Sequence, residues 1–118
     1  MISADKPEFF AEEYRNVFDT GVLGNINLYN LFLPQILKGK VKKVIFTSSG
    51  HADLDFVNAF DIDVCSVYSA GKAAMNIINA KYSAQYKKDG VLFLSISPGM
   101  VDVGHFSTCM ICLLPSKI

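Results

Sequence analysis

The sequence predicts an α/β protein built on a parallel sheet. Two short apolar runs, at residues 44–47 and 91–96, have the composition of strands buried on both faces. Each run follows a long segment in which apolar residues recur at spacings of three and four, as in amphipathic helices. The resulting order is helix, strand, helix, strand, which is typical of parallel strands joined by crossover helices. The 118 residues amount to at most one domain of ordinary size.

Residues 7–37 are predicted to form the first helix. Pro7 suits a first helical turn, acidic residues follow it at the positive end, and Gly39 marks the stop. Gly21 and Gly24 lie inside this helix, where each costs about 1 kcal/mol relative to alanine. We therefore expect a close packing contact at these glycines.

The first strand is predicted at residues 44–47, where β-branched and aromatic residues run into the turn Ser48–Gly50. Residues 50–65 are predicted to be an irregular loop, because four aspartates are interspersed there and aspartate disfavours helix interiors. The spacing of an EF-hand is missing, so a calcium site is not expected.

The second helix is predicted from residue 65 or 66 to about Lys88, ending at Asp89-Gly90. Its predicted inward residues are Val67, Ala70, Ala74, Ile77, Ile78 and Tyr82. A second strand follows at residues 91–97 and stops at Pro98-Gly99, and residues 106–118 are a tail with no assignment.

Polar residues gather where both predicted strands end. In an open parallel sheet, ligands bind outside the carboxyl ends of the strands. Tyr68 and Lys72 follow the first strand and share one face of the second helix. An ammonium beside a phenol favours the phenolate, so this tyrosine could exchange a proton with an alcohol or carbonyl oxygen. A Tyr-x3-Lys pair alone arises easily by accident, and the case rests on its order relative to the strands.

Three segments together carry a resemblance to a known family. They are VIFTSSG at residues 44–50, YSAGKAA at residues 68–74 and SPGMV at residues 97–101. In this order the chain resembles the short-chain dehydrogenase/reductase family over about residues 8–105. The resemblance implies a partial Rossmann-like, doubly wound parallel sheet, with residues 1–105 as a partial NAD(P)-binding domain and residues 106–118 as an unassigned tail.

The resemblance also implies an activity and a set of residue roles. The activity is NAD(P)-dependent oxidoreduction between an alcohol and a carbonyl, with a small molecule as substrate and NAD or NADP as cofactor. Tyr68 would be the proton donor and acceptor, Lys72 would bind the nicotinamide ribose, and Ser49 would bind the substrate oxygen. Pro98, Gly99 and Val101 would flank the nicotinamide, and the two long helices would form a homo-oligomer interface.

The chain departs from the family pattern in three respects. The glycine-rich phosphate turn is missing, and we expect the chain to begin after it. Gly21 stands where the family has a catalytic asparagine, and Val103 stands where a threonine is common. We therefore expect weak or no activity and no tight dinucleotide binding from the isolated chain. A truncated, inactive fragment or subunit-interaction remnant is the alternative, and an unrelated α/β module with similar motifs is a third.

Composition narrows the range of partners and sites. Hydrophobic residues make up 51%, charged residues 19% and the net charge is zero, so neither nucleic acid nor a membrane surface is an expected partner. The sequence shows no transmembrane run and no signal-peptide pattern, so we expect a cytoplasmic protein. Cys109 and Cys112 have CxxC spacing, but His105 is the only further ligand nearby, so we expect no metal site.

Overall fold

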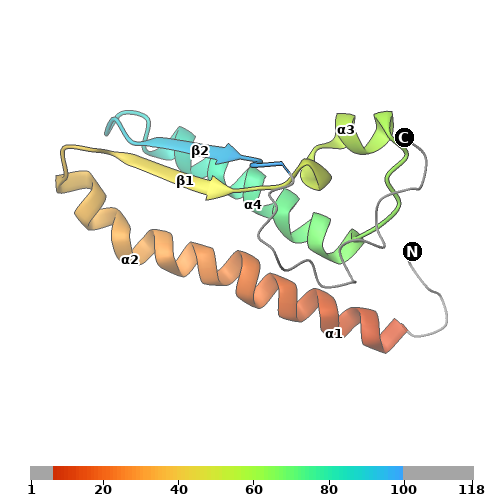
Figure 1. The fold of residues 1–118 in the computed structure, drawn as a ribbon. Helices are drawn as coiled ribbons and strands as arrows, with labels where there is room; N and C mark the ends of the chain where they lie inside the picture. Colours follow the sequence, from red (N-terminus) through yellow and green to blue (C-terminus); the bar gives the residue numbers. More distant parts are fainter. Residues whose placement is uncertain (1–6, 100–118) are drawn as a thin grey trace, which may run out of the picture.

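The computed structural model describes residues 7–99, which form a small sheet with long helices along one side and a short helix beyond the strand ends (Figure 1). The elements in chain order are α1 (Pro7–Phe18), a π-helical turn (Asp19–Leu23), α2 (Gly24–Lys38), β1 (Lys43–Thr47), a 3-10 turn (Gly50–Ala52), α3 (Leu54–Ala59), α4 (Ser66–Gln85) and β2 (Leu92–Ile96). This is the α/β architecture that the sequence predicts.

The two strands pair in parallel, with α4 as the crossover between them. Lys43 lies opposite Leu92 at one end and Thr47 opposite Ile96 at the other. The register therefore brings the carboxyl ends of both strands to the same edge of the sheet. Parallel pairing and helical crossover confirm a partial Rossmann-like fold.

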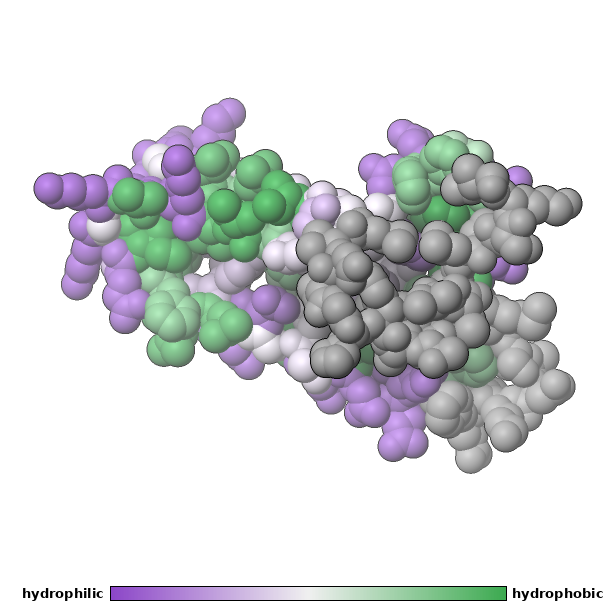
Figure 2. Space-filling model, viewed as in Figure 1, coloured by the Kyte–Doolittle hydropathy of each residue, from purple (hydrophilic) through white to green (hydrophobic). Residues whose placement is uncertain are grey.

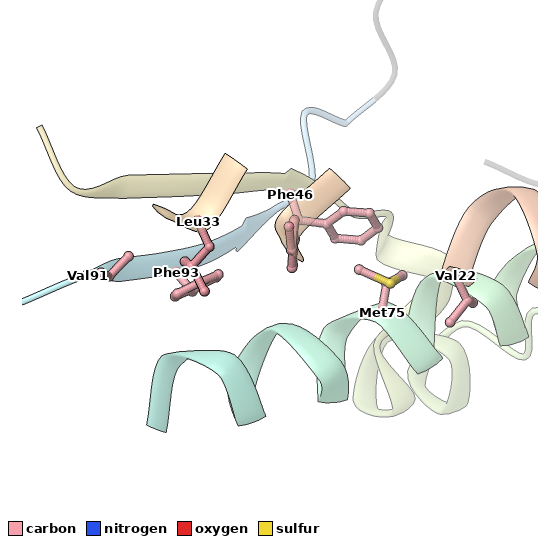
Figure 3. Packing of buried hydrophobic residues seen from close by; sticks show 7 residues of the cluster. Val22, Leu33, Phe46, Met75, Val91 and Phe93 are labelled. Atoms are coloured by element: carbon pink, nitrogen blue, oxygen red, sulfur yellow. The ribbon is translucent and has the colours of Figure 1, made fainter. Parts of the chain in front are cut away.

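The hydrophobic core lies between one face of the sheet and the two long helices (Figure 3). Phe46 and Phe93 point from the sheet towards α4, and Leu33 of α2 lies beside Phe93 in the same cluster. Met75 of α4 has no exposed surface and joins this cluster. Burial of one such side chain stabilises a fold by about 1.5–3 kcal/mol. These contacts hold α4 against the strands.

The opposite face of the sheet is apolar and exposed within the described part of the chain. Its members are Ile45, Leu92, Leu94 and Ile96, which are 43–60% exposed. The continuous apolar runs in the sequence are those of strands buried on both sides, but residues 7–99 cover only the side that carries Phe46 and Phe93.

The first helical segment runs from Pro7 to Lys38, as predicted, but the π-helical turn interrupts its α-helical hydrogen bonding. The side chain of Asn25 donates a hydrogen bond to the carbonyl oxygen of Gly21 at 2.6 Å. A π-helical turn breaks the regular i→i−4 hydrogen bonding of the backbone, and here the side-chain amide of Asn25 donates to one of the carbonyl oxygens of that turn.

The expected close contact at the helix glycines is wrong. A Cβ on Gly21 would meet nothing within 4 Å, and one on Gly24 would meet only the carbonyl oxygen of Asp19 at 3.6 Å. The close approach occurs instead at Gly71 of α4, where a Cβ would lie 2.6 Å from Cγ1 of Val17. The crossing of α1 and α4 therefore requires a glycine at position 71.

The predicted irregular loop at residues 50–65 contains the short helix α3, so that prediction is wrong in part. A carboxylate oxygen of Asp53 accepts a hydrogen bond from the Phe56 amide at 2.8 Å and caps this helix. Asp55 follows in its first turn, near the positive end of the peptide dipoles. Two of the four aspartates that suggested a loop thus belong to the start of a helix, Asp53 as its cap and Asp55 in its first turn.

The inward face of α4 differs in part from the predicted one. Ile77 is 59% exposed, and the buried residues are Gly71, Met75 and Asn79. The helix ends at Gln85 rather than near Lys88. Asn79 is buried because it has polar partners on both sides, which hydrophobic periodicity alone does not reveal.

Candidate active site

Lys72 connects the start of α4 to the end of β1. Its Nζ donates a hydrogen bond to the carbonyl oxygen of Thr47 at 2.7 Å. The same atom lies 4.9 Å from the ring centroid of Phe46 and 5.6 Å from that of Tyr68. Both distances are within the range of cation–π attraction. The structure therefore brings Tyr68, Lys72 and the last residue of β1 together, and the Tyr68 side chain is accessible at 42% exposure.

Ser49 lies two residues beyond Thr47, on the chain that leaves β1. Its backbone is extended, with φ of −147° and ψ of 149°, and its Oγ accepts a hydrogen bond from the backbone amide of His51 at 3.3 Å. Within residues 7–99 its hydroxyl proton is committed to no partner. A substrate oxygen could therefore accept it.

Pro98 and Gly99 follow β2 at the same edge of the sheet as Ser49 follows β1. Gly99 has a φ of +73°, in the left-handed region that favours glycine. Val101, the last residue predicted to flank a nicotinamide, lies outside the described residues. Val103 lies outside them too, and so do His105, Cys109 and Cys112, for which no metal site is expected.

A cavity of about 610 Å³ lies between the strand ends and α3. One wall carries neutral polar side chains, those of Ser48, Ser49, Asn76, Ser95 and Ser97. The other wall comes from the segment after β1 and contains Gly50, Asp53, Asp55, Phe56 and Ala59. The surface dips between the sheet and α3 (Figure 2). Ser49 lines this cavity, whereas Tyr68 and Lys72 are not among its lining residues.

Hydrogen bonds between α4 and the strands fix the polar wall. The Ser48 hydroxyl donates to Oδ1 of Asn76 at 2.7 Å, and Nδ2 of Asn79 donates to Oγ of Ser95 at 2.9 Å. The Tyr29 hydroxyl in turn donates to Oδ1 of Asn79 at 3.1 Å. Burial, and then the neighbouring Tyr82, raise the pKa of Tyr29 above its ordinary value of 10.0.

Sequence reasoning missed Asn76. Asn76 lies four residues after Lys72, so it shares the helix face that carries Tyr68 and Lys72. That spacing is a usable signal, because a polar side chain continuing a functional face is a candidate for the same site. The resemblance implies that residues 50–65 shape the substrate pocket, and Asp55 and Phe56 of this segment do line the cavity.

Among residues 7–99, no helix has the length and apolar character needed to cross a membrane.

Comparison with known proteins agrees with the motifs. The short chain dehydrogenase family matches residues 2–109 of the chain. The chain is 53% identical over 102 residues to short-chain dehydrogenase/reductase iacC of Pestalotiopsis fici, covering 86% of this chain and 38% of that protein. It is 49% identical over 105 residues to short chain dehydrogenase virK of Hypocrea virens, covering 89% of this chain and 39% of that protein.

The chain thus spans about two fifths of the length of these curated relatives. No solved structure matches it at a comparable level. The family match covers most of the chain and includes the strand–turn, Tyr-x3-Lys and Pro-Gly segments whose geometry is described above. The chain therefore belongs to the short-chain dehydrogenase/reductase family of oxidoreductases.

Proposed function

We propose that this chain carries the proton-transfer half of an NAD(P)-dependent oxidoreductase that interconverts an alcohol and a carbonyl. The observation that supports this best is the position of Lys72, whose Nζ lies beside the Tyr68 ring and is bound to the carbonyl of Thr47. That contact holds a positive charge next to a phenol at the edge of the sheet where ligands of such folds bind.

In the reducing direction, Tyr68 gives its hydroxyl proton to the carbonyl oxygen of the substrate. The ammonium of Lys72 stabilises the phenolate that this transfer leaves behind. Ser49 donates its free hydroxyl proton as a hydrogen bond to the same substrate oxygen and stabilises the negative charge that develops there. In the oxidising direction, Tyr68 as phenolate takes the proton from the alcohol.

NAD or NADP is the cofactor that the family generally uses, and the residues near the strand ends fit its nicotinamide portion. When bound, the cofactor accepts or supplies the hydride. Tyr68 and Lys72 would hold the ribose hydroxyls, and Pro98, Gly99 and Val101 would line the ring. Gly99 suits this role because a left-handed residue without Cβ lets a ligand approach the backbone closely.

The partner we propose is a second copy that packs on the long helices. Leu28 and Leu31 of α2 are 52% and 64% exposed, and Ile77 of α4 is 59% exposed. Apolar residues on helix surfaces of this kind are typical of subunit contacts.

The test grafts residues 2–109 in place of the matching segment of the Pestalotiopsis fici relative, which supplies the remaining three fifths of the protein. We expect the chimera to oxidise NADH or NADPH with aldehydes or ketones. Tyr68→Phe should abolish this turnover, because it removes only the proton-transferring hydroxyl. Tyr86→Phe is the matched control, since Tyr86 lies at the far end of α4. Full turnover in the Tyr68→Phe chimera would show that another group is the acid.

An inactive, subunit-binding remnant is the second candidate. Gly21 stands at the asparagine position of the family, and the outer sheet face is exposed in residues 7–99. A chimera that folds and binds NADH but turns over no carbonyl compound, and that stays inactive after Gly21→Asn, would favour this alternative.

A further inference from the structure

We infer that the cavity between α3 and the strand ends binds an uncharged, oxygen-bearing aromatic compound and rejects anions. This rests on the proposed function, since such a compound would be the alcohol or carbonyl substrate. Ser49 belongs both to the cavity wall and to the proposed catalytic set. Ser97, next to Pro98, brings the same cavity to the end of β2.

The neutral wall offers hydrogen-bond donors. Asn76 uses Oδ1 to accept from Ser48, which leaves its amide protons without a partner among residues 7–99. Ser49 and Ser95 use their oxygens as acceptors, from the His51 amide and from Nδ2 of Asn79, which leaves their hydroxyl protons. Donors of this kind suit carbonyl, hydroxyl or ether oxygens of a ligand.

The opposite wall offers an aromatic ring. Phe56 is 43% exposed, lies 4.9 Å from Phe60 between ring centroids and is close to Gly50, where a Cβ would sit 3.5 Å from the ring. The glycine thus leaves room for the ring beside the backbone that leads away from Ser49. An aromatic ligand could pack on this ring, because offset or edge contacts of aromatic pairs are favourable.

The charged residues that line the cavity within residues 7–99 are both acidic. Asp53 and Asp55 line it, and no lysine, arginine or histidine does so among the described residues. A carboxylate or phosphate on a ligand would therefore be repelled by both aspartates, since Lys72, which is hydrogen-bonded to the carbonyl oxygen of Thr47, does not line this cavity. An uncharged ligand avoids this repulsion while keeping the hydrogen bonds of the serine and asparagine wall.

The experiment compares two probes that differ in one group: 2-naphthalenemethanol, which is neutral, and 2-naphthoate, which is an anion. Binding to the 118-residue protein is measured by titration and followed by amide chemical shifts in NMR, without cofactor or turnover. Each exposed carboxylate can weaken anion binding up to about fivefold. We expect the alcohol to bind about tenfold tighter than the acid. Shift changes should centre on Ser49, Asn76 and Phe56.

Asp55→Asn should reduce the ratio of the affinities of the two probes about threefold, because it removes one exposed charge. Phe56→Leu, which keeps an apolar side chain on α3, should weaken both probes about three- to tenfold. Asp61→Asn and Leu54→Ala are matched controls outside the cavity lining, and they should leave the affinities of both probes unchanged. Equal affinity for the two probes, an unchanged difference in Asp55→Asn, or no binding of either probe would overturn the inference. These titrations measure binding without turnover. A chimera without activity would therefore contradict the proposed chemistry but not the inference about the cavity.

Discussion

Asn79 is the residue that connects the two helices and the sheet by polar contacts. It is 2% exposed, accepts from the Tyr29 hydroxyl of α2 and donates to Oγ of Ser95 on β2. A buried amide costs stability unless its donors and acceptors are paired, so these contacts fix the positions of their partners. Ser95 lies on the cavity wall, and the network therefore reaches from the core to the candidate site.

Replacement of Asn79 by alanine should destabilise the fold. The change leaves the Tyr29 hydroxyl unpaired and removes the contact to Ser95, and we expect the free energy of unfolding to fall by about 2–4 kcal/mol. Urea unfolding followed by circular dichroism measures this. Asn30→Ala is the control, because its contact to the Tyr82 hydroxyl is exposed, and it should cost less than about 1 kcal/mol. Equal costs for the two variants would contradict a special role for Asn79.

Tyr29 should make the fold sensitive to alkaline pH. Burial raises its pKa in the folded protein above the ordinary 10.0, so the unfolded chain loses its proton first as pH rises. The stabilising contribution is therefore complete below about pH 10 and is lost as pH rises through the folded pKa. Urea titrations on either side of pH 10 should show a smaller decline for Tyr29→Phe than for the parent protein. An equal fall in the free energy of unfolding for both proteins would show that other groups control the sensitivity to alkaline pH.

At the scale of elements, the crossing of α1 and α4 depends on the close approach at Gly71. The side chain of Val17 occupies the space in which a Cβ at this position would lie, at 2.6 Å. This crossing also positions the two residues proposed to act in proton transfer, because Gly71 precedes Lys72 and follows Tyr68 by three residues on the same helix. A shift of α4 away from α1 would move both side chains relative to β1.

Gly71→Ala should destabilise the protein although alanine is the better helix former. Overpacking costs about 1–3 kcal/mol, and the helix-propensity gain is about 1 kcal/mol. Thermal unfolding measures the net loss, and Val17→Ala in the same chain should restore stability by making room. Gly21→Ala is the control without a clash, since a Cβ there meets nothing within 4 Å. Stabilisation by Gly71→Ala would mean that the two helices lie farther apart than the structure has them.

The sequence predicts the elements well where hydrophobic periodicity or an apolar run defines them. Both strands, the parallel arrangement and the two long helices follow from such patterns. The sequence does not reveal α3, because Asp53 acts as a cap only through a contact that depends on local geometry. It also misplaces Ile77 and overlooks Asn79, since the helix is oriented by polar pairs across the core rather than by apolar side chains alone. Which residues line the cavity is likewise a matter of tertiary packing.

At the scale of the whole molecule, the two faces of the sheet are unequal. Helices α2 and α4 cover the side that carries Phe46 and Phe93, whereas the side that carries Ile45 and Leu94 is exposed in residues 7–99 (Figures 1 and 2). An apolar sheet face with unpaired strand edges favours association with further polypeptide. Self-association of the isolated chain could thus use either this face or the long helices.

We expect changes to the sheet face to reduce that self-association. Ile45 and Leu94 lie opposite each other in register, so Ile45→Lys with Leu94→Glu makes the face polar and pairs the new charges across the strands. Light scattering after size-exclusion chromatography, over a concentration series, gives the mass. Leu28→Lys with Leu31→Lys alters the exposed surface of α2 instead and tests the proposed subunit contact. If only the α2 variant lowers the mass, the sheet face is not an association surface.

The hydrogen bond from Lys72 to Thr47 links a cation on α4 to the last residue pair of the parallel sheet. Thr47 pairs with Ile96, and the next amide, that of Ser48, donates to the Ile96 carbonyl at 2.7 Å. A slip of β1 by one residue would carry the anchoring oxygen about 3.3 Å along the sheet and turn alternate side chains to the other face. A shifted register would therefore break the hydrogen bond of Lys72 even if α4 itself remained intact. The correct strand register is thus required to place this charge beside the phenol.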